Sequence, residues 1–315
     1  MAASISKSTS VQYNVVYNKW FKFCECHNFD AYKPNKNSIL RFLTDRYKDG
    51  VSYGTVNSDR SALSLILDNK IGADEHISRF CKGVAKLRPP KPKYAFTWNV
   101  AIVLNYFKTL HPLEELTFSQ LSYKTVMLLL LVTGHRAQTI ASIKLENILS
   151  SKDGVLIYIT DKMKISAPGQ MQPLLYLPFC IDNPKNCVAT ILLYYCKVSK
   201  SHRLNNERKC FIATRKPFKG ITAQTVSRWA KLVLEKSGID LTIFSAHSTR
   251  YASTSSAHSK GVDIDTIKEL LAGQRDLKFL QDSIIGQLIL SLVILYLMSH
   301  VLLLRTQIIN SVNAC

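Results

Sequence analysis

Acidic residues are scarce in this chain of 315 residues. Asp and Glu number 22 against 41 Lys and Arg, which gives a formal net charge of +19 and a pI near 9.6. A surface with such an excess of positive charge attracts polyanions: nucleic acid, an acidic partner or an anionic membrane face. This balance favours DNA or RNA as the partner, with a generically basic protein as the alternative.

Motifs for disulfides, metals and secretion are also lacking. The eight Cys are scattered without a C-x-x-C pair, and a polar stretch follows Met1 where a secretory leader would be charged and then apolar. We therefore expect free thiols in a reducing compartment, the nucleus or the cytoplasm before import. Cys24, Cys26 and His27 lie close together, but their spacing does not fit a four-ligand zinc site. We expect neither a metal nor a cofactor.

The first ninety residues have the pattern of a small helical bundle. Apolar residues recur at three- and four-residue steps from Tyr13 to Phe23, and a second stripe begins at Ile39. The stretch LRPPKPKYAFTW then ends the helical pattern, because its three prolines favour a stiff, extended backbone. We predict a helical domain over 1–90 and a basic linker over 91–96.

The linker region carries three candidate DNA-binding side chains. Arg88, Lys91 and Lys93 flank the prolines, so the segment is either a plain spacer or a strap that crosses a phosphate backbone.

Beyond Thr97 the chain mixes helix and strand. KTVMLLLLVTGHRAQTIASIKL has two helical runs interrupted at Gly134, and the first of them is apolar all round and therefore predicted to be buried. GVLIYIT and PLLYLPF alternate like strands, with a turn at Pro168 and Gly169. A helix is predicted from a Thr222 cap to Gly238, and another in FSAHSTRYASTSSAHSKG. The fold class is mainly α with a small antiparallel β-sheet.

Four basic side chains of this half are candidates for chemistry. Arg136 follows the Gly134 break, Lys164 lies beside the tip of the predicted hairpin, and His247 and Arg250 stand three residues apart on one helical face. Each also has an ordinary interpretation: Arg136 could pair with Glu146, Lys164 could be a solvated turn residue, and His247 a core imidazole.

At these residues the sequence resembles a known family. TGHRAQTIASIKL, the Lys of KISAPG and AHSTRYASTSSA occur in the order found in the catalytic domain of tyrosine recombinases, the phage-integrase-like enzymes. The amino-acid sequences of these motifs most resemble those of the recombinases of animal DIRS-like and Crypton mobile elements. VQYNVVYNKWFKFC, YGTVNSDRSALS and RFCKGVAKLRPPKPKY are similar to that group's helical core-binding domain and linker, so the resemblance runs from about Ser8 to Gly273.

The resemblance implies an architecture and partners. It predicts a SAM-like helical core-binding domain and an α+β catalytic domain over 97–275 that clamp double-stranded DNA. Strand exchange in the family uses a tetramer whose contacts involve the carboxy terminus.

It also implies a role for each basic residue in DNA recombination and integration. Arg136 and Arg250 would grip the scissile phosphate, because a guanidinium donates through a fixed fork. Lys164 would protonate the departing 5′ oxygen, and His247 would assist proton transfer. A Tyr hydroxyl would then hold the DNA as a 3′-phosphotyrosine before rejoining.

The pattern breaks where that Tyr is expected. After DIDTIKELLAG, which ends at Gly273, the expected run reads RDLKFLQDSIIGQ and contains no Tyr. Tyr296, the one Tyr beyond it, is flanked by apolar residues, which suit a deprotonatable phenol poorly. This version of the enzyme is therefore predicted to be inactive.

The tail over 276–315 has three interpretations. The stretch from Ile284 to Leu304 contains no Asp, Glu, Lys or Arg. It is long enough for a membrane anchor and is also compatible with a core or oligomer helix. The favoured hypothesis is out-of-frame translation: with suitable synonymous codons, FLQDSIIGQLI shifted by two bases reads FARFYNRPID, which resembles the missing end of the family motif, Tyr included. A membrane partner is not expected.

Overall fold

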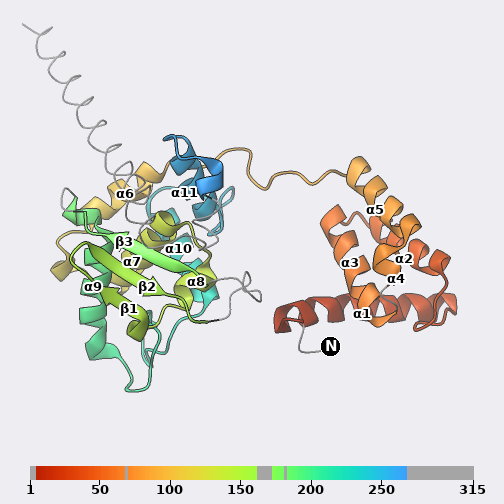
Figure 1. The fold of residues 1–315 in the computed structure, drawn as a ribbon, viewed down its shortest axis with the longest axis horizontal. Helices are drawn as coiled ribbons and strands as arrows, with labels where there is room; N and C mark the ends of the chain where they lie inside the picture. Colours follow the sequence, from red (N-terminus) through yellow and green to blue (C-terminus); the bar gives the residue numbers. More distant parts are fainter. Residues whose placement is uncertain (1–4, 68–69, 162–171, 181–182, 268–315) are drawn as a thin grey trace, which may run out of the picture. The chain divides into compact units, whose positions relative to one another are not determined.

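A computed structural model describes residues 5–67, 70–161, 172–180 and 183–267. The chain divides into two compact units between Lys93 and Tyr94, a boundary that falls within the basic linker predicted over 91–96. Each unit has its own hydrophobic core. Figure 1 shows the first unit in red to orange and the second in yellow to blue.

The first unit is all-helical. Its helices are α1 (Lys7–His27), α2 (Lys36–Lys48), α3 (Tyr53–Ile66), α4 (Lys70–Ala73) and α5 (Glu75–Leu87).

Local sequence and packing both support these helices. Ser6, Asn35, Ser52 and Asp74 cap the starts of α1, α2, α3 and α5 by accepting backbone N–H groups. Trp20 of the predicted apolar stripe is fully buried. Its ring contacts the edge of Phe42 at 5.3 Å between centroids.

The second unit combines helices with a small sheet. Its α-helices are α6 (Val100–Thr109), α7 (Phe118–Thr133), α8 (Ala137–Ala141), α9 (Val188–Ser199), α10 (Ala223–Lys236) and α11 (Ser248–His258). Short 3-10 turns lie at Leu113–Glu115, Leu145–Asn147, Pro184–Asn186 and Lys200–His202.

Helix α7 is the centre of this unit. A capping box at Thr117 and Gln120 starts it, and Gly134 ends it in the left-handed conformation at φ 60°. Ten of its residues, from Leu121 to Leu131, are buried, and α8, α9, α10 and α11 all contact it. The prediction of a buried helix that breaks at Gly134 is confirmed.

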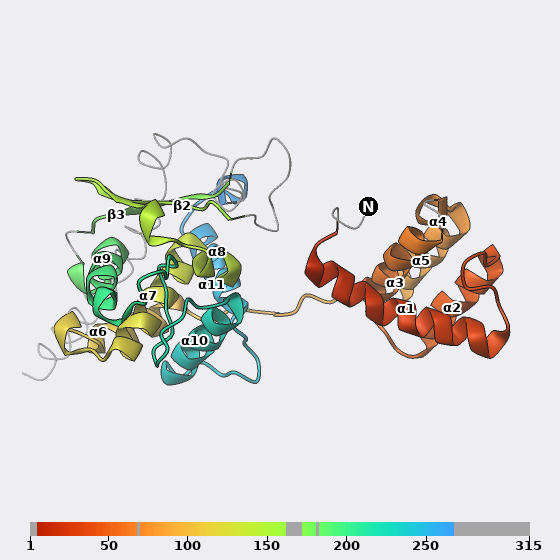
Figure 2. The same ribbon diagram turned by 90° about the horizontal axis from the view of Figure 1, so that it is seen from below.

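The sheet is antiparallel in the order β1, β2, β3, with bounds Ile148–Ser150, Gly154–Tyr158 and Leu174–Pro178. Leu156 of β2 pairs with Tyr176 of β3, and the sheet lies along one side of the helices (Figure 2). Strands β2 and β3 fall within the predicted GVLIYIT and PLLYLPF, whereas the turn predicted at Pro168 and Gly169 lies outside the described residues. The predicted fold class, mainly helical with a small antiparallel sheet, is confirmed.

Among the described residues, no helix is both long and apolar enough to cross a bilayer. The apolar tail over 276–315, with each of its three interpretations, lies outside the residues that the structure describes.

Candidate active site

The site is a cavity that runs along one face of α11, from its N-cap His247 to His258 and Ser259 at its end. Arg136 lies between Gly134 and the first turn of α8, at the N-cap position. His247 is the N-cap residue of α11, and Arg250 is in its first turn. The hydroxyl of Ser253 donates to the carbonyl of Leu131 near the end of α7, which joins the two helices beside the cavity.

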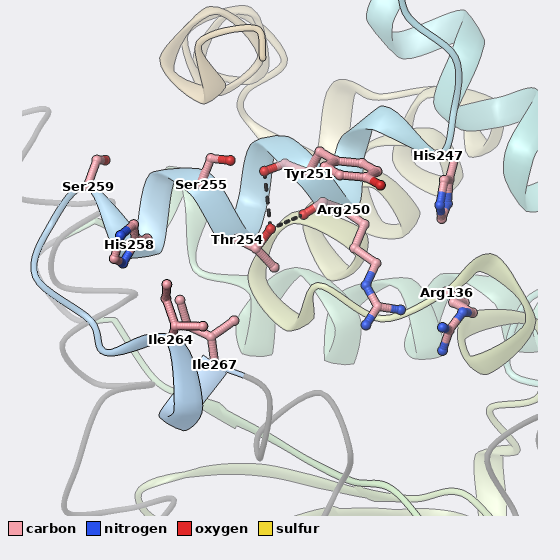
Figure 3. Close-up of a pocket in the computed structure, with 10 residues that line it drawn as sticks. All are labelled: Arg136, His247, Arg250, Tyr251, Thr254, Ser255, His258, Ser259, Ile264 and Ile267. Carbon is pink, nitrogen blue, oxygen red and sulfur yellow. Dashed lines mark hydrogen bonds between the residues drawn. The ribbon is translucent and has the colours of Figure 1, made fainter. Parts of the chain in front are cut away.

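This arrangement brings three of the four predicted catalytic residues together. The cavity has a volume of about 570 Å³ and is lined by Arg136, His247, Arg250, Tyr251, Thr254, Ser255, His258, Ser259, Ile264 and Ile267. In Figure 3 both guanidinium groups reach into the same space, and the His247 imidazole lies beside them. Lys164 falls in the segment 162–171, outside the described residues, so its role stays a prediction.

The two arginines have no carboxylate partner in the part of the chain that the structure describes. No acidic side chain in the described part of the chain forms an ion pair with Arg136 or Arg250. Glu146, the partner considered for Arg136, instead accepts a hydrogen bond of 3.0 Å from Nε of Arg208. The ordinary interpretation of Arg136 as the partner of Glu146 is therefore wrong.

Two guanidinium groups make the site electropositive, and burial and like-charge repulsion oppose further positive charge there. Burial, and then the charge of Arg136, lower the pKa of Arg250. Burial, reinforced by Arg250 and Arg136, lowers the pKa of neighbouring His135 to about 4, so His135 is neutral near pH 7. No carboxylate among the described residues balances the charge of the two arginines, and two planar guanidiniums suit a phosphate group.

Comparison with known proteins adds a decisive observation. The sequence profile of the phage integrase family matches residues 108–276, which is more than half of the chain. The chain belongs to the phage integrase family. No match was found among curated proteins.

Solved structures of integrases share the fold. The Tn1549 transposon integrase in complex with circular intermediate DNA is 11% identical, with a TM-score of 0.57, and the match covers 89% of this chain and 90% of that one. A lambda integrase dimer bound to a COC′ core site is 15% identical, with a TM-score of 0.52 and coverage of 88% and 71%. A lambda integrase tetramer bound to a Holliday junction is 15% identical, with a TM-score of 0.51 and coverage of 87% and 74%. At these identities the likeness concerns the fold, an all-helical unit followed by a unit of helices and a small sheet.

The three candidate DNA-binding residues in and before the linker differ in their exposure and contacts. Lys91 and Lys93 are exposed. Arg88 is half-buried and donates to the carbonyls of Tyr47 at 3.2 Å and Val51 at 2.6 Å, and its guanidinium lies 4.3 Å from the centre of the Tyr47 ring. Arg88 thus has a structural role in the first unit, and its DNA contact, like those of Lys91 and Lys93, stays a prediction.

Sequence reasoning missed several residues of the cavity. Tyr251 is 48% exposed and lies in the cavity beside Arg250 and His247. The available signal was spacing, because Tyr251 follows His247 by four residues and Ser255 and Ser259 continue the same helical face. His258 lines the far end of the cavity and contacts the carbonyl of Val262 through Nδ1 at 3.2 Å.

Proposed function

We propose that this chain is a DNA-binding tyrosine recombinase whose site holds one phosphodiester of duplex DNA between Arg136 and Arg250. The observation that carries the proposal is the shared cavity, in which both guanidiniums meet without a neutralising carboxylate among the described residues. Bringing two like charges together costs folding free energy, which a phosphate bound between them would offset.

The side chains of the site suit phosphodiester cleavage and rejoining. The two arginines would hold the non-bridging oxygens and stabilise the charge that builds in the transition state. His247 would relay a proton to or from the attacking hydroxyl, and Lys164, carried by the segment between β2 and β3, would protonate the leaving 5′ oxygen. Formation of a 3′-phosphotyrosine would keep the energy of the broken phosphodiester for rejoining.

A second function is favoured by the residues after Gly273. RDLKFLQDSIIGQ has no Tyr, so we propose that the chain as given binds DNA without cleaving it. It would then act as a DNA-binding protein derived from a recombinase, able to compete for the ends of a mobile element. Out-of-frame translation explains how the phenol was lost while the phosphate site was kept.

Salt-dependent DNA binding tests the phosphate site. The slope of log K against log salt concentration is negative, and Arg136→Ala and Arg250→Ala should each make it shallower by about one, since each removes one ionic contact with phosphate. Non-specific binding itself should largely remain. Arg208→Ala is the matched control, because Arg208 is an exposed arginine of the same unit that pairs with Glu146; its slope should not change. Equal slopes for all three variants would contradict the proposal.

A suicide DNA substrate separates the two functions. A nicked duplex traps any covalent protein–DNA adduct, and we expect none from this chain. An adduct would show that the chain cleaves DNA and would contradict the loss of the nucleophile. Restoring the shifted reading frame after Phe279 should restore the adduct, and Arg136→Ala in that restored protein should abolish it.

The encoding locus tests the origin of the chain. We propose descent from a DIRS-like or Crypton mobile element and a nuclear site of action on DNA, in line with the resemblance of the catalytic motifs. The nucleotides that encode Asp282 to Ile284 decide the frame hypothesis, because other synonymous codons would not yield the Tyr-containing peptide. Imaging of the tagged protein tests the nuclear location, and sedimentation on DNA tests assembly into a tetramer.

A further inference from the structure

Residues just after the unit boundary pack against the segment that carries His247. The Tyr94 ring lies 5.8 Å from that of Phe244, and Phe96 contacts Phe244 edge-on at 5.6 Å. The indole Nε1 of buried Trp98 donates to Oγ of Ser248 at 2.9 Å. The start of the second unit therefore borders the segment 244–248 on both sides of His247.

Tyr94 reaches His247 by two routes. Its hydroxyl lies 2.6 Å from Oγ of Ser245, two residues before His247. Its ring contacts Tyr251 edge-on, with centroids 5.6 Å apart and planes at 73°. Tyr251 in turn contacts the His247 imidazole at 5.8 Å and 87°. Tyr94, Tyr251 and His247 thus form a row of perpendicular rings, a geometry that aromatic groups favour.

The helix itself does little to orient His247. His247 is exposed, and as N-cap residue it makes no side-chain capping bond to α11. A proton-transfer group is useful in one orientation only. Contacts from neighbouring rings can select that orientation.

We propose that Tyr94 is a positioning residue that orients His247 toward the phosphodiester held by Arg136 and Arg250. This inference rests on the proposed function of that site. Tyr94 does not line the cavity; it acts through the Ser245 hydroxyl and through the Tyr251 ring.

Histidine NMR of the full chain tests the inference. The ring 13C–1H signal of His247 is assigned by its loss in His247→Gln, and that of His258, at the far end of the same cavity, by its loss in His258→Gln. In the DNA-free protein, Tyr94→Leu should move the His247 signal and leave the His258 signal in place. Tyr94→Phe keeps the ring contacts and loses the hydroxyl contact. Its His247 signal should therefore lie between the His247 signal of the unaltered chain and that of Tyr94→Leu.

The control is Tyr194→Leu, a half-buried tyrosine on α9 that makes no contact with residues 244–251 through a described ring pair or hydrogen bond. It should leave both signals unchanged. An unchanged His247 signal in Tyr94→Leu, or equal movement of His258, would overturn the inference. If Tyr94→Leu does not fold, an unchanged His247 signal in Tyr94→Phe overturns it.

Addition of a short DNA duplex separates this inference from the proposed function. In the unaltered chain the duplex should move the His247 signal, and Tyr94→Leu should largely lose that response. If DNA moves neither histidine signal in the unaltered chain, the proposal that this cavity binds a phosphodiester is wrong. The DNA-free spectra still decide whether Tyr94 orients His247.

Discussion

The stability of the second unit should fall between pH 6.5 and pH 4 because of His135. This imidazole is 7% exposed, and burial next to Arg250 and Arg136 lowers its folded-state pKa to about 4, against about 6.5 in an unfolded chain. The folded state therefore keeps His135 neutral over a range in which the unfolded state binds a proton. Stability from this group is present above pH 6.5 and is lost as the pH falls toward 4.

The size of the effect follows from the two pKa values. At 1.36 kcal/mol for each pKa unit, linkage gives a loss of about 2 kcal/mol at pH 5 and about 3 kcal/mol at pH 4. Other groups titrate in this range, so the quantity to compare is the difference between the unaltered chain and His135→Gln, which cannot titrate. Relative to its value at pH 7, the free energy of unfolding of the unaltered chain minus that of His135→Gln should fall by about 2 kcal/mol at pH 5 and by about 3 kcal/mol at pH 4.

The assay is urea unfolding at several pH values, followed by tryptophan fluorescence. The chain has three Trp, and Trp20 lies in the first unit, so a Trp20→Phe background leaves Trp98 and Trp229 to report on the second unit alone. Arg250→Gln should reduce the pH dependence without removing it, since burial is the larger cause of the shift. Parallel loss of stability in His135→Gln and the unaltered chain between pH 7 and pH 5 would refute the reasoning.

Three further predictions concern stability. Lys124 is fully buried and donates to the carbonyls of Phe107 and Leu110 at 3.0 and 2.7 Å. Burial lowers its pKa to about 8, so the free energy of unfolding should rise as the pH increases from 8 toward 10.5. Lys124→Met, measured by urea unfolding, should remove that rise. The Thr249 hydroxyl is buried with no hydrogen-bond partner among the described residues, so Thr249→Val should stabilise the unit by about 1 kcal/mol, and a lower melting temperature would contradict this. Gly134→Ala should destabilise by about 1 kcal/mol, because φ is 60° there; an unchanged denaturation midpoint would show that strain is absent.

Elements governed by short-range chemistry could be predicted from the sequence. The helix predicted from Thr222 to Gly238 is α10, with the Thr222 hydroxyl accepting the N–H of Thr225 and Gly238 at φ 81°. The break at Gly134 and the helix that carries His247 were likewise predictable. Capping and backbone freedom act over a few residues, so the local sequence contains the information they need.

The composition and motif order of the chain indicated its class and three residues that line one cavity. A net charge of +19 indicated a polyanionic partner, and the order of the motifs that contain Arg136, Lys164, and His247 with Arg250 carried the family resemblance. The reason is that a phosphate site needs particular residue types, which a sequence displays directly.

Only the tertiary structure decided which groups are partners. Glu146 pairs with Arg208 and leaves Arg136 to the cavity, and Arg88 is held by the carbonyls of Tyr47 and Val51. Tyr94, in the stretch predicted as linker, contacts Ser245 and Tyr251, which lie before and after His247 in the sequence. These contacts join residues dozens to more than a hundred positions apart, and their energies depend on burial and distance, which arise only when the helices pack.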